Sequence, residues 1–165
     1  MRVAINGFGR IGKLVFRAII EKNLKNVQIV AINELGSLES SLHLVNFDST
    51  HGELKTKLYK SNKGIKYNNK NIIFCSEKDP AKLPWKKLGI DVVLECSGVF
   101  TSKEKSQSHI IAGAKKVIIS APAQNADATI VQGVNNNILN KKHNIISNGS
   151  CTTNCLAPVA MVLDK

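Results

Sequence analysis

The sequence contains few aromatic side chains and no long apolar run. Aromatic residues make up 5% of the 165 residues, with one Trp and two Tyr, so few rings are available to stack on nucleic-acid bases. No stretch approaches the ~20 apolar residues that a membrane-spanning helix needs. The first residues lead straight into a strand pattern and carry no signal-peptide features. We therefore expect a cytoplasmic protein without a membrane partner.

Arginine is scarce, although the chain is strongly basic. Twenty-three Lys and Arg oppose twelve Asp and Glu, for a formal net charge of +11, but only Arg2, Arg10 and Arg17 are arginines. Arginine is the side chain best suited to paired contacts with phosphates and bases. The lysines are scattered, with no run longer than two. We interpret the charge as a solvated lysine surface and do not expect nucleic acid as the main partner.

The composition is otherwise that of an average soluble domain, with 43% hydrophobic and 21% charged residues. A chain of this length can bury one substantial core and is too short for two large domains. Apolar stretches of strand length alternate with segments of helical periodicity. Strands are expected at 2–6, 27–32, 72–75, 91–96, 116–120, 128–132 and 144–147, and helices at 10–22, 38–47, 102–112 and 151–163, the last interrupted early by Pro158.

This alternation of strands and helices predicts an α/β fold with a doubly wound, mostly parallel sheet. Between residues 48 and 71 the chain is polar and rich in turn signals, which favours short antiparallel strands or loops. In the first helix, Ile11, Leu14, Val15, Ala18 and Ile19 recur at helical spacing. Ligands of such sheets lie beyond the carboxyl ends of the strands, so we look for a site there.

A glycine-rich turn follows the first expected strand and opens the first helix. Gly7, Gly9 and Gly12 form the pattern G-x-G-x-x-G, in which the glycines allow a tight turn, a close approach of a pyrophosphate and close helix packing. The helix N-terminus supplies free N–H groups for that pyrophosphate. Glu34 ends the second strand, where a carboxylate can bind an adenine-ribose diol and repel a 2′-phosphate. The pattern predicts NAD rather than NADP.

A simpler interpretation of the same residues exists. The glycines could serve only a tight strand-to-helix turn, and Glu34 could be a solvated loop acid. The agreement of strand, turn, helix and acid favours the cofactor site.

The four cysteines divide into two pairs. Cys75 and Cys96 lie in or at the ends of apolar strands, where we expect buried, inert thiols. Cys151 and Cys155 have a C-x3-C spacing that matches neither common zinc pairs nor a thioredoxin-like motif. We therefore expect no metal site.

Cys151 differs from the others in its position. It follows a strand, a turn and a potential N-cap at Ser150, so its sulfur should lie in the first turn of a helix. Free N–H groups and the helix dipole there favour the thiolate over the thiol. Such a thiolate could attack an aldehyde carbon beside a nicotinamide cofactor, although a buried structural cysteine is an equal alternative from geometry alone. Cys155, one turn later, is expected to pack inward.

Five segments, in order along the chain, closely resemble the phosphorylating glyceraldehyde-3-phosphate dehydrogenase family. They are NGFGRIG (6–12), DSTHG (48–52), SGVFT (97–101), GAKKVIISAP (113–122) and SNGSCTTNCLAP (147–158). The resemblance covers the whole chain, and the last segment is highly specific. It implies an oxidoreductase of glycolysis and gluconeogenesis that uses NAD.

The resemblance also implies a reaction and its residues. In the family a cysteine forms a thiohemiacetal with glyceraldehyde 3-phosphate, hydride passes to NAD, and inorganic phosphate releases the thioester as 1,3-bisphosphoglycerate. Cys151 matches this nucleophile. The cofactor residues implied by the match, besides the three glycines, are Arg10 and Ile11 at the pyrophosphate, Glu34 at the adenine ribose, Lys78 at the adenine and Ser120 near the nicotinamide ribose. Ser150 and Thr152 would contact substrate or the attacking phosphate.

The domain organisation follows from the same match. Residues 1–149 are expected to form an NAD-binding domain of Rossmann type, and 150–165 the first helix of a catalytic domain. The family's activating histidine would lie beyond Lys165, and His43, His51, His109 and His143 are expected to be structural or solvated. These residues alone should therefore be nearly inactive. The family also implies a homotetramer.

Two other functions stay open. Glu34 replaces the family's usual Asp and, with Leu83-Pro84-Trp85, resembles the erythrose-4-phosphate dehydrogenase branch. From a different class, a stand-alone NAD- or RNA-binding module would use the basic surface or the phosphate site.

Overall fold

The computed structural model describes residues 1–164. The strands are β1 (Arg2–Asn6), β2 (Gln28–Asn33), β3 (Phe47–Asp48), β4 (Gly52–Glu53), β5 (Tyr59–Ser61), β6 (Gly64–Tyr67), β7 (Lys70–Cys75), β8 (Val92–Glu95), β9 (Lys116–Ile119), β10 (Ala128–Thr129) and β11 (Ile145–Ser147). The α-helices are α1 (Arg10–Glu21), α2 (Leu38–Asn46), α3 (Trp85–Leu88), α4 (Lys103–Ile111) and α5 (Cys151–Leu163). Short 3-10 turns lie at Pro80–Lys82 and Asn136–Ile138.

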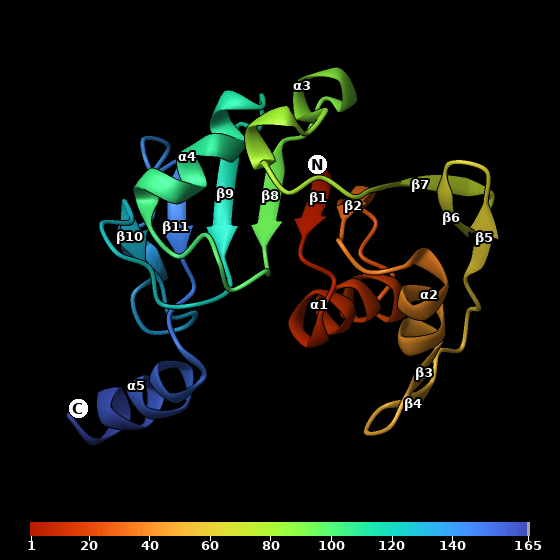
Figure 1. Ribbon diagram of the computed structural model, residues 1–165. Coiled ribbons are helices and arrows are strands. Elements are labelled where there is room, and N and C mark those ends of the chain that lie inside the picture. The colour runs from red at the N-terminus through yellow and green to blue at the C-terminus, as the bar shows by residue number, and fades with distance from the viewer. Residues whose placement is uncertain (165) are drawn as a thin grey trace.

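Nine of these strands form one sheet in the order β10-β11-β9-β8-β1-β2-β7-β6-β5 (Figure 1). The pairs from β10 to β7 are parallel, and β6 and β5 are antiparallel additions at the edge. β3 and β4 form a separate two-stranded hairpin. The expected α/β fold, a Rossmann-like and mostly parallel sheet, is confirmed. Within residues 1–164 no helix is both long and apolar enough to cross a membrane.

Helices cover both faces of the sheet, so the side chains on both faces of β1 are buried. Ala4 belongs to the core cluster that packs against α3 and α4, whereas its neighbour Ile5 belongs to the cluster under α1 and α2. Both side chains are 0% exposed. Because successive residues of a strand point to opposite faces, a strand buried on both faces is apolar without alternation.

α1 turns a different face to the sheet from the one that the apolar spacing predicts. Its buried apolar positions are Gly12, Phe16 and Ile20, whereas Ile11 is 48% exposed and Ala18 is also exposed. Gly12 has no side chain, and its backbone lies against the carbonyl of Gly7 and the side chain of Ile5 in β1. Positions four and eight residues later lie on the same face and are buried with it.

α5 is the element that differs most from expectation. It runs through Pro158 without interruption, and none of its residues is buried. Pro158 removes only the bond to the carbonyl four residues earlier, which water can reach on an exposed helix. Cys155 is exposed rather than packed inward, because residues 1–164 offer no surface against which α5 packs (Figure 1). Of the expected 150–165 segment, Lys165 lies outside the described residues.

Candidate functional site

A crevice opens at the carboxyl ends of the central strands. β1 lies between β2 and β8, and the chain leaves these strands toward opposite faces of the sheet. A cavity of about 320 Å³ lies there, lined by Asn6, Gly7, Gly9, Asn33, Glu34, Leu35, Glu77, Lys78, Cys96, Ser97, Val99 and Phe100. Among the residues expected to bind a cofactor, it brings together Gly7, Gly9, Glu34 and Lys78. Doubly wound sheets bind ligands at this switch point in the strand order.

Each glycine of the turn after β1 has a different surrounding. Gly7 has φ +86°, a conformation that favours glycine, and a Cβ there would collide with the backbone of Ser97. A Cβ on Gly12 would collide with the carbonyl oxygen of Gly7. A Cβ on Gly9 would meet nothing within 4 Å. The turn therefore needs Gly7 and Gly12 for its own packing and leaves open space only at Gly9.

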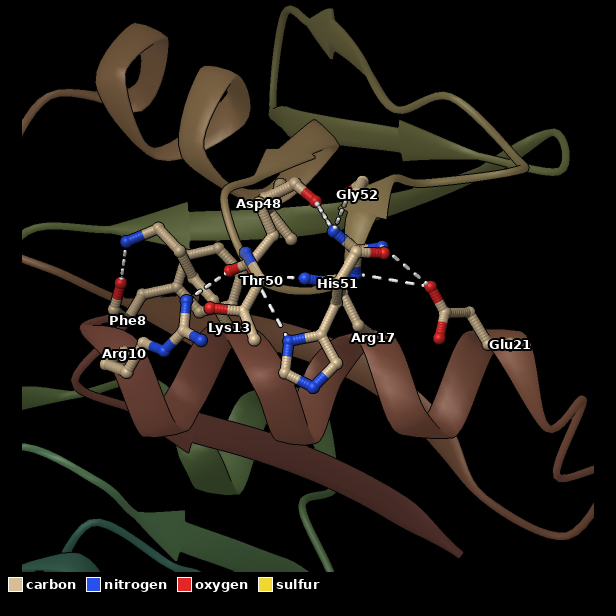
Figure 2. Close-up of polar contacts among 10 residues, drawn as sticks. Phe8, Arg10, Lys13, Arg17, Glu21, Asp48, Thr50, His51 and Gly52 are labelled. Carbon is tan, nitrogen blue, oxygen red and sulfur yellow. Dashed lines mark hydrogen bonds and ion pairs between the residues drawn. The ribbon is translucent and has the colours of Figure 1, made fainter.

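The first turn of α1 presents backbone donors beside this space. The N–H groups of Arg10, Ile11 and Gly12 precede the first intrahelical bond, in which Lys13 N donates to Gly9 O at 3.1 Å. The side chain of Arg10 points elsewhere, because its guanidinium pairs with Asp48 (Figure 2). Arg10 and Ile11 can therefore offer a pyrophosphate their backbone N–H groups and the helix dipole.

Asp48 organises the loop that receives Arg10. Its Oδ1 accepts bonds from the backbone N–H of His51 at 2.8 Å and of Thr50 at 2.9 Å, and contacts the His51 ring at 3.1 Å. The His51 N–H bond is the main reason why the pKa of Asp48 lies well below its usual value. The DSTHG segment is thus a loop packed on α1, and its histidine contacts Asp48 through Nδ1.

Glu34 is tied to the glycine-rich turn. Its Oε2 accepts from Phe8 N at 2.6 Å, and its Oε1 accepts from Gly36 N at 3.0 Å. Burial raises the pKa of Glu34, but the bonds from Gly36 and Phe8 and the charge of Lys13 outweigh it, so the pKa is lowered. The carboxylate therefore stays charged, with acceptor capacity left on both oxygens.

Ser120 lies on the next strand along the sheet. It follows β9 directly, and its N–H donates to the carbonyl of Glu95 at 3.0 Å. Cys96, the residue that follows Glu95, lines the cavity. Ser120 itself does not line the cavity, because β9, which it follows, lies on the far side of β8 from β1.

The sequence interpretation missed three polar residues at the crevice, of which Asn6 and Asn33 line the cavity and Glu95 lies beneath it. Asn6, Asn33 and Glu95 end β1, β2 and β8, and the strand register places Asn6 beside both of the others. All three are buried. A usable signal was present, because each is a polar residue at the end of an otherwise apolar strand.

Cys75 and Cys96 fit the prediction of unreactive thiols, although both are only partly buried. Burial raises the pKa of Cys75. Burial also raises the pKa of Cys96 to about 11. Both thiols therefore stay protonated near neutral pH and are poor nucleophiles.

The expected nucleophile lies at the start of α5. Ser150 is the N-cap, and its Oγ accepts from Thr153 N at 2.9 Å and contacts the Thr152 hydroxyl at 2.9 Å. Cys151 occupies the first helical position and is exposed. Asn148 N donates to the carbonyl of Ile119 at 2.9 Å, which anchors the loop before α5 to the end of β9. Ser150, Cys151 and Thr152 are thus together, outside the lining of the cavity.

None of the histidines in residues 1–164 hydrogen-bonds to Cys151. His109 is buried against Trp85 and Glu95, and His143 contacts Asn140. His43 is an exposed residue of α2 whose ring lies against that of Phe47 in a tilted arrangement.

The residues of the crevice fit a dinucleotide. Gly9 leaves space where a Cβ would intrude, α1 aims free N–H groups at that space, and Glu34 presents a charged acceptor to a diol. Lys78 supplies a cation at the cavity wall. Among the described residues, no group of three His, Cys, Asp or Glu side chains could hold a metal ion.

Comparisons with known proteins identify the family of the chain. The family model "Glyceraldehyde 3-phosphate dehydrogenase, NAD binding domain" matches residues 1–103. The chain is 50% identical over 164 residues to glyceraldehyde-3-phosphate dehydrogenase of Xanthobacter flavus, which is 99% of this chain and 49% of the relative. It is 51% identical over 166 residues to the Mycoplasma pneumoniae enzyme of the same name, which is 100% of this chain and 49% of the relative.

A third relative, glyceraldehyde-3-phosphate dehydrogenase of Pseudomonas aeruginosa, is 48% identical over 166 residues, with 100% of this chain and 50% of the relative aligned. The chain thus spans about half the length of the curated relatives it matches. The family model covers well over half of the chain and includes the glycine-rich turn, Glu34 and Lys78. The chain belongs to the glyceraldehyde-3-phosphate dehydrogenase family, and its cofactor is NAD.

Proposed function

We propose that the chain supplies the cofactor site and the nucleophile of an NAD-dependent, phosphorylating glyceraldehyde-3-phosphate dehydrogenase. The observation that carries this proposal is the bond from Phe8 N to Glu34, which joins the glycine-rich turn to an acidic group at the edge of a 320 Å³ cavity. Relatives of 48–51% identity that bear this enzyme's name support the choice of substrate.

The cofactor residues have distinct tasks in this proposal. When bound, NAD accepts a hydride from the substrate. The open space at Gly9 admits the pyrophosphate, which the N–H groups of Arg10 and Ile11 bind. Glu34 accepts bonds from the adenine ribose and excludes a 2′-phosphate. The remaining cofactor contacts come from Gly7, Gly12, Lys78 and Ser120.

Cys151 is the proposed nucleophile. Its thiolate forms a bond to the aldehyde carbon of glyceraldehyde 3-phosphate, and the carbonyl oxygen takes up a proton from water to give a thiohemiacetal. Loss of a hydride from that carbon, together with loss of the hydroxyl proton to water, oxidises it to a thioester. An oxygen of inorganic phosphate then attacks the carbonyl carbon, the C–S bond breaks, and 1,3-bisphosphoglycerate leaves with the thiolate restored. Ser150 and Thr152 would contact the substrate or the attacking phosphate.

Selective alkylation tests the nucleophile. Cys151 and Cys155 are both exposed on α5, so Cys155 is an internal control for access. Because only Cys151 lies in the first turn, we expect iodoacetamide to modify it at least about threefold faster, measured by peptide mass spectrometry. Glyceraldehyde 3-phosphate should slow the modification of Cys151 alone. Equal rates, or no protection, would contradict the proposal.

A second aldehyde remains a candidate substrate, because Glu34 and the Leu83-Pro84-Trp85 segment resemble the erythrose-4-phosphate dehydrogenase branch. Kinetics with both aldehydes, each with and without inorganic phosphate, would separate the two in a chain of family length. Strict dependence on phosphate with glyceraldehyde 3-phosphate supports the first candidate.

The domain boundary belongs to the same proposal. Residues 1–149 would form the NAD-binding domain, and α5 would begin a catalytic domain. The absence of buried residues in α5, with Leu156 66% and Val159 55% exposed, supports this division within the described residues. We also propose a homotetramer in the cytoplasm, as the family resemblance implies.

A further inference from the structure

Three buried polar side chains lie side by side beneath the crevice. Asn6, Asn33 and Glu95 are 3%, 5% and 1% exposed, and the register of β2, β1 and β8 places them in a row. A buried polar group is costly unless it is hydrogen-bonded, and a buried charge is costlier still. The hydrogen-bond partners of these three side chains therefore show how their burial is stabilised.

Glu95 is surrounded by donors. Its Oε1 accepts from Ser97 N at 2.8 Å and also from the Ser97 hydroxyl. Its Oε2 accepts from Asn6 Nδ2 at 2.6 Å and from His109 Nε2 at 2.8 Å. A carboxylate has about four acceptor positions on its two oxygens, and all of them are used here.

The other ring nitrogen of His109 determines which atom donates in the bond between His109 and Glu95. The indole Nε1–H of Trp85, which can only donate, contacts Nδ1 of His109 at 3.1 Å. Nδ1 must therefore accept, and the ring proton lies on Nε2, where it points at Glu95. His109 in this arrangement is a neutral donor, and Trp85 is connected to Glu95 through it.

The directions on the other side are determined by the backbone. Asn33 Oδ1 accepts from Glu77 N at 2.9 Å, and its Nδ2 donates to Glu77 O at 2.9 Å and to Asn6 Oδ1 at 2.7 Å. Because the backbone N–H and C=O of Glu77 cannot exchange roles, Asn33 cannot flip its amide. Asn6 then has to accept from Asn33 and donate to Glu95.

We propose that Glu95 is a positioning residue for NAD, which sets the walls of the cofactor cavity through this network. The inference rests on the proposed cofactor site. Four of the connected residues, Asn6, Asn33, Glu77 and Ser97, line the cavity, whereas Glu95 does not. The backbone of Ser97 also packs against Gly7, so a shift of Ser97 moves the glycine-rich turn.

Glutamine cannot take over this role, although it has the same shape. If the NH2 group of the glutamine pointed at Ser97, it would meet the backbone N–H of Ser97, and two donors would face each other. If the NH2 group pointed the other way, it would meet two donors, Nε2–H of His109 and Nδ2 of Asn6. Neither of these groups can become an acceptor, because their other hydrogen bonds fix their orientation. Either orientation forces a backbone shift or an unsatisfied buried donor in a wall of the cavity.

The test compares Glu95→Gln with a matched control. Asn46→Asp makes the reverse isosteric change at a buried residue outside the cavity, where Asn46 exchanges bonds with the backbone of Leu58. Both variants should melt at a lower temperature than the parent chain. We expect Glu95→Gln to weaken NAD binding at least about tenfold by calorimetry, and Asn46→Asp to change it less than about twofold. Equal NAD affinity of Glu95→Gln and the parent chain would overturn the proposal.

A measurement on the unmodified chain covers the case in which Glu95→Gln does not fold. Trp85 is the only tryptophan, so its indole N–H gives one resolved NMR signal. NAD should shift this signal and the side-chain amide signals of Asn6 and Asn33 more than that of Asn46. Shifts no larger than those of Asn46 overturn the inference. If the unmodified chain binds no NAD at all, the proposed cofactor site itself fails.

Discussion

Glu34 is the residue at which the choice of cofactor can be tested. Its carboxylate also holds Phe8 N and Gly36 N, so its removal loses both a ligand contact and a support of the turn. We expect Glu34→Ala to weaken NAD binding about tenfold or more, since hydrogen bonds to charged groups contribute about 1.5–3 kcal/mol. The preference for NAD over NADP should fall as well.

Calorimetric titration with both cofactors measures this effect. Glu39→Ala is a suitable control, because Glu39 is an exposed acid of α2 that pairs with Lys60 outside the cavity. An unchanged NAD affinity in Glu34→Ala would show that Glu34 is only a loop acid.

Gly9 and Gly12 offer a second residue-scale prediction, because the same substitution should have different effects. A methyl group on Gly9 meets nothing within 4 Å, so Gly9→Ala should keep the melting temperature and weaken NAD binding by blocking the phosphate approach. On Gly12 it collides with the Gly7 carbonyl, so Gly12→Ala should lower the stability by about 1–3 kcal/mol. Thermal melting and calorimetry on both variants separate the effects, and equal losses of stability would refute the distinction.

At the scale of elements, Arg17 fixes the loop between β3 and β4 to α1. Its side chain is 3% exposed, and the guanidinium donates to the carbonyls of Gly52 at 2.8 Å and His51 at 3.4 Å, and to Glu21 at 3.0 Å (Figure 2). Arg10 adds its ion pair with Asp48 at the other end of the loop. Two of the three arginines therefore hold this segment against α1.

Asp127 connects α4 to β11 and gives a prediction on pH. Burial raises its pKa, but the Lys103 ammonium and the N–H groups of Ile145 and Asn144 have a larger, opposite effect. The pKa of Asp127 is therefore lowered to about 2. A carboxyl whose pKa is lower in the folded than in the unfolded state stabilises the fold above the unfolded pKa of about 3.9. That contribution disappears as the pH falls from about 4 to 2.

The variant Asp127→Asn isolates this contribution. In urea unfolding at several pH values, the stability difference between the parent chain and the variant should be constant above about pH 5 and shrink toward pH 2. A difference that does not change with pH would contradict the assignment.

Most elements could be predicted from the sequence because their signals are local. β1 is a short apolar run, α4 and α5 begin after the N-cap residues Ser102 and Ser150, and the Gly-rich turn carries its pattern within six residues. The buried face of α1 could not be predicted, because it depends on the approach of Gly12 to β1. The exposure of Cys155 depends on what packs on α5. The role of Glu95 arises from residues as distant as Asn6, Asn33 and His109, which only the strand register brings together.

At the scale of the whole molecule, the position of the histidines leads to a prediction on activity. None of the histidines in residues 1–164 hydrogen-bonds to Cys151, and His109, His51 and His143 are bound to other side chains. We therefore expect these 165 residues to bind NAD and to give negligible NADH from glyceraldehyde 3-phosphate and phosphate. Sustained NADH formation, followed by absorbance and abolished by Cys151→Ser, would contradict this expectation.

β1 has two neighbours that are very unequally distant along the chain. β2 follows it after one helix, but the partner of Asn6 on β8 is 89 residues away. At synthesis rates of about 5–20 residues per second, roughly 4–18 s separate the appearance of β1 from that of β8. During that time the side of β1 that will face β8 is an open, apolar sheet edge, the kind of surface that pairs with other chains. The strand that carries the floor of the cofactor crevice is therefore also the one that most needs protection while the protein is being made.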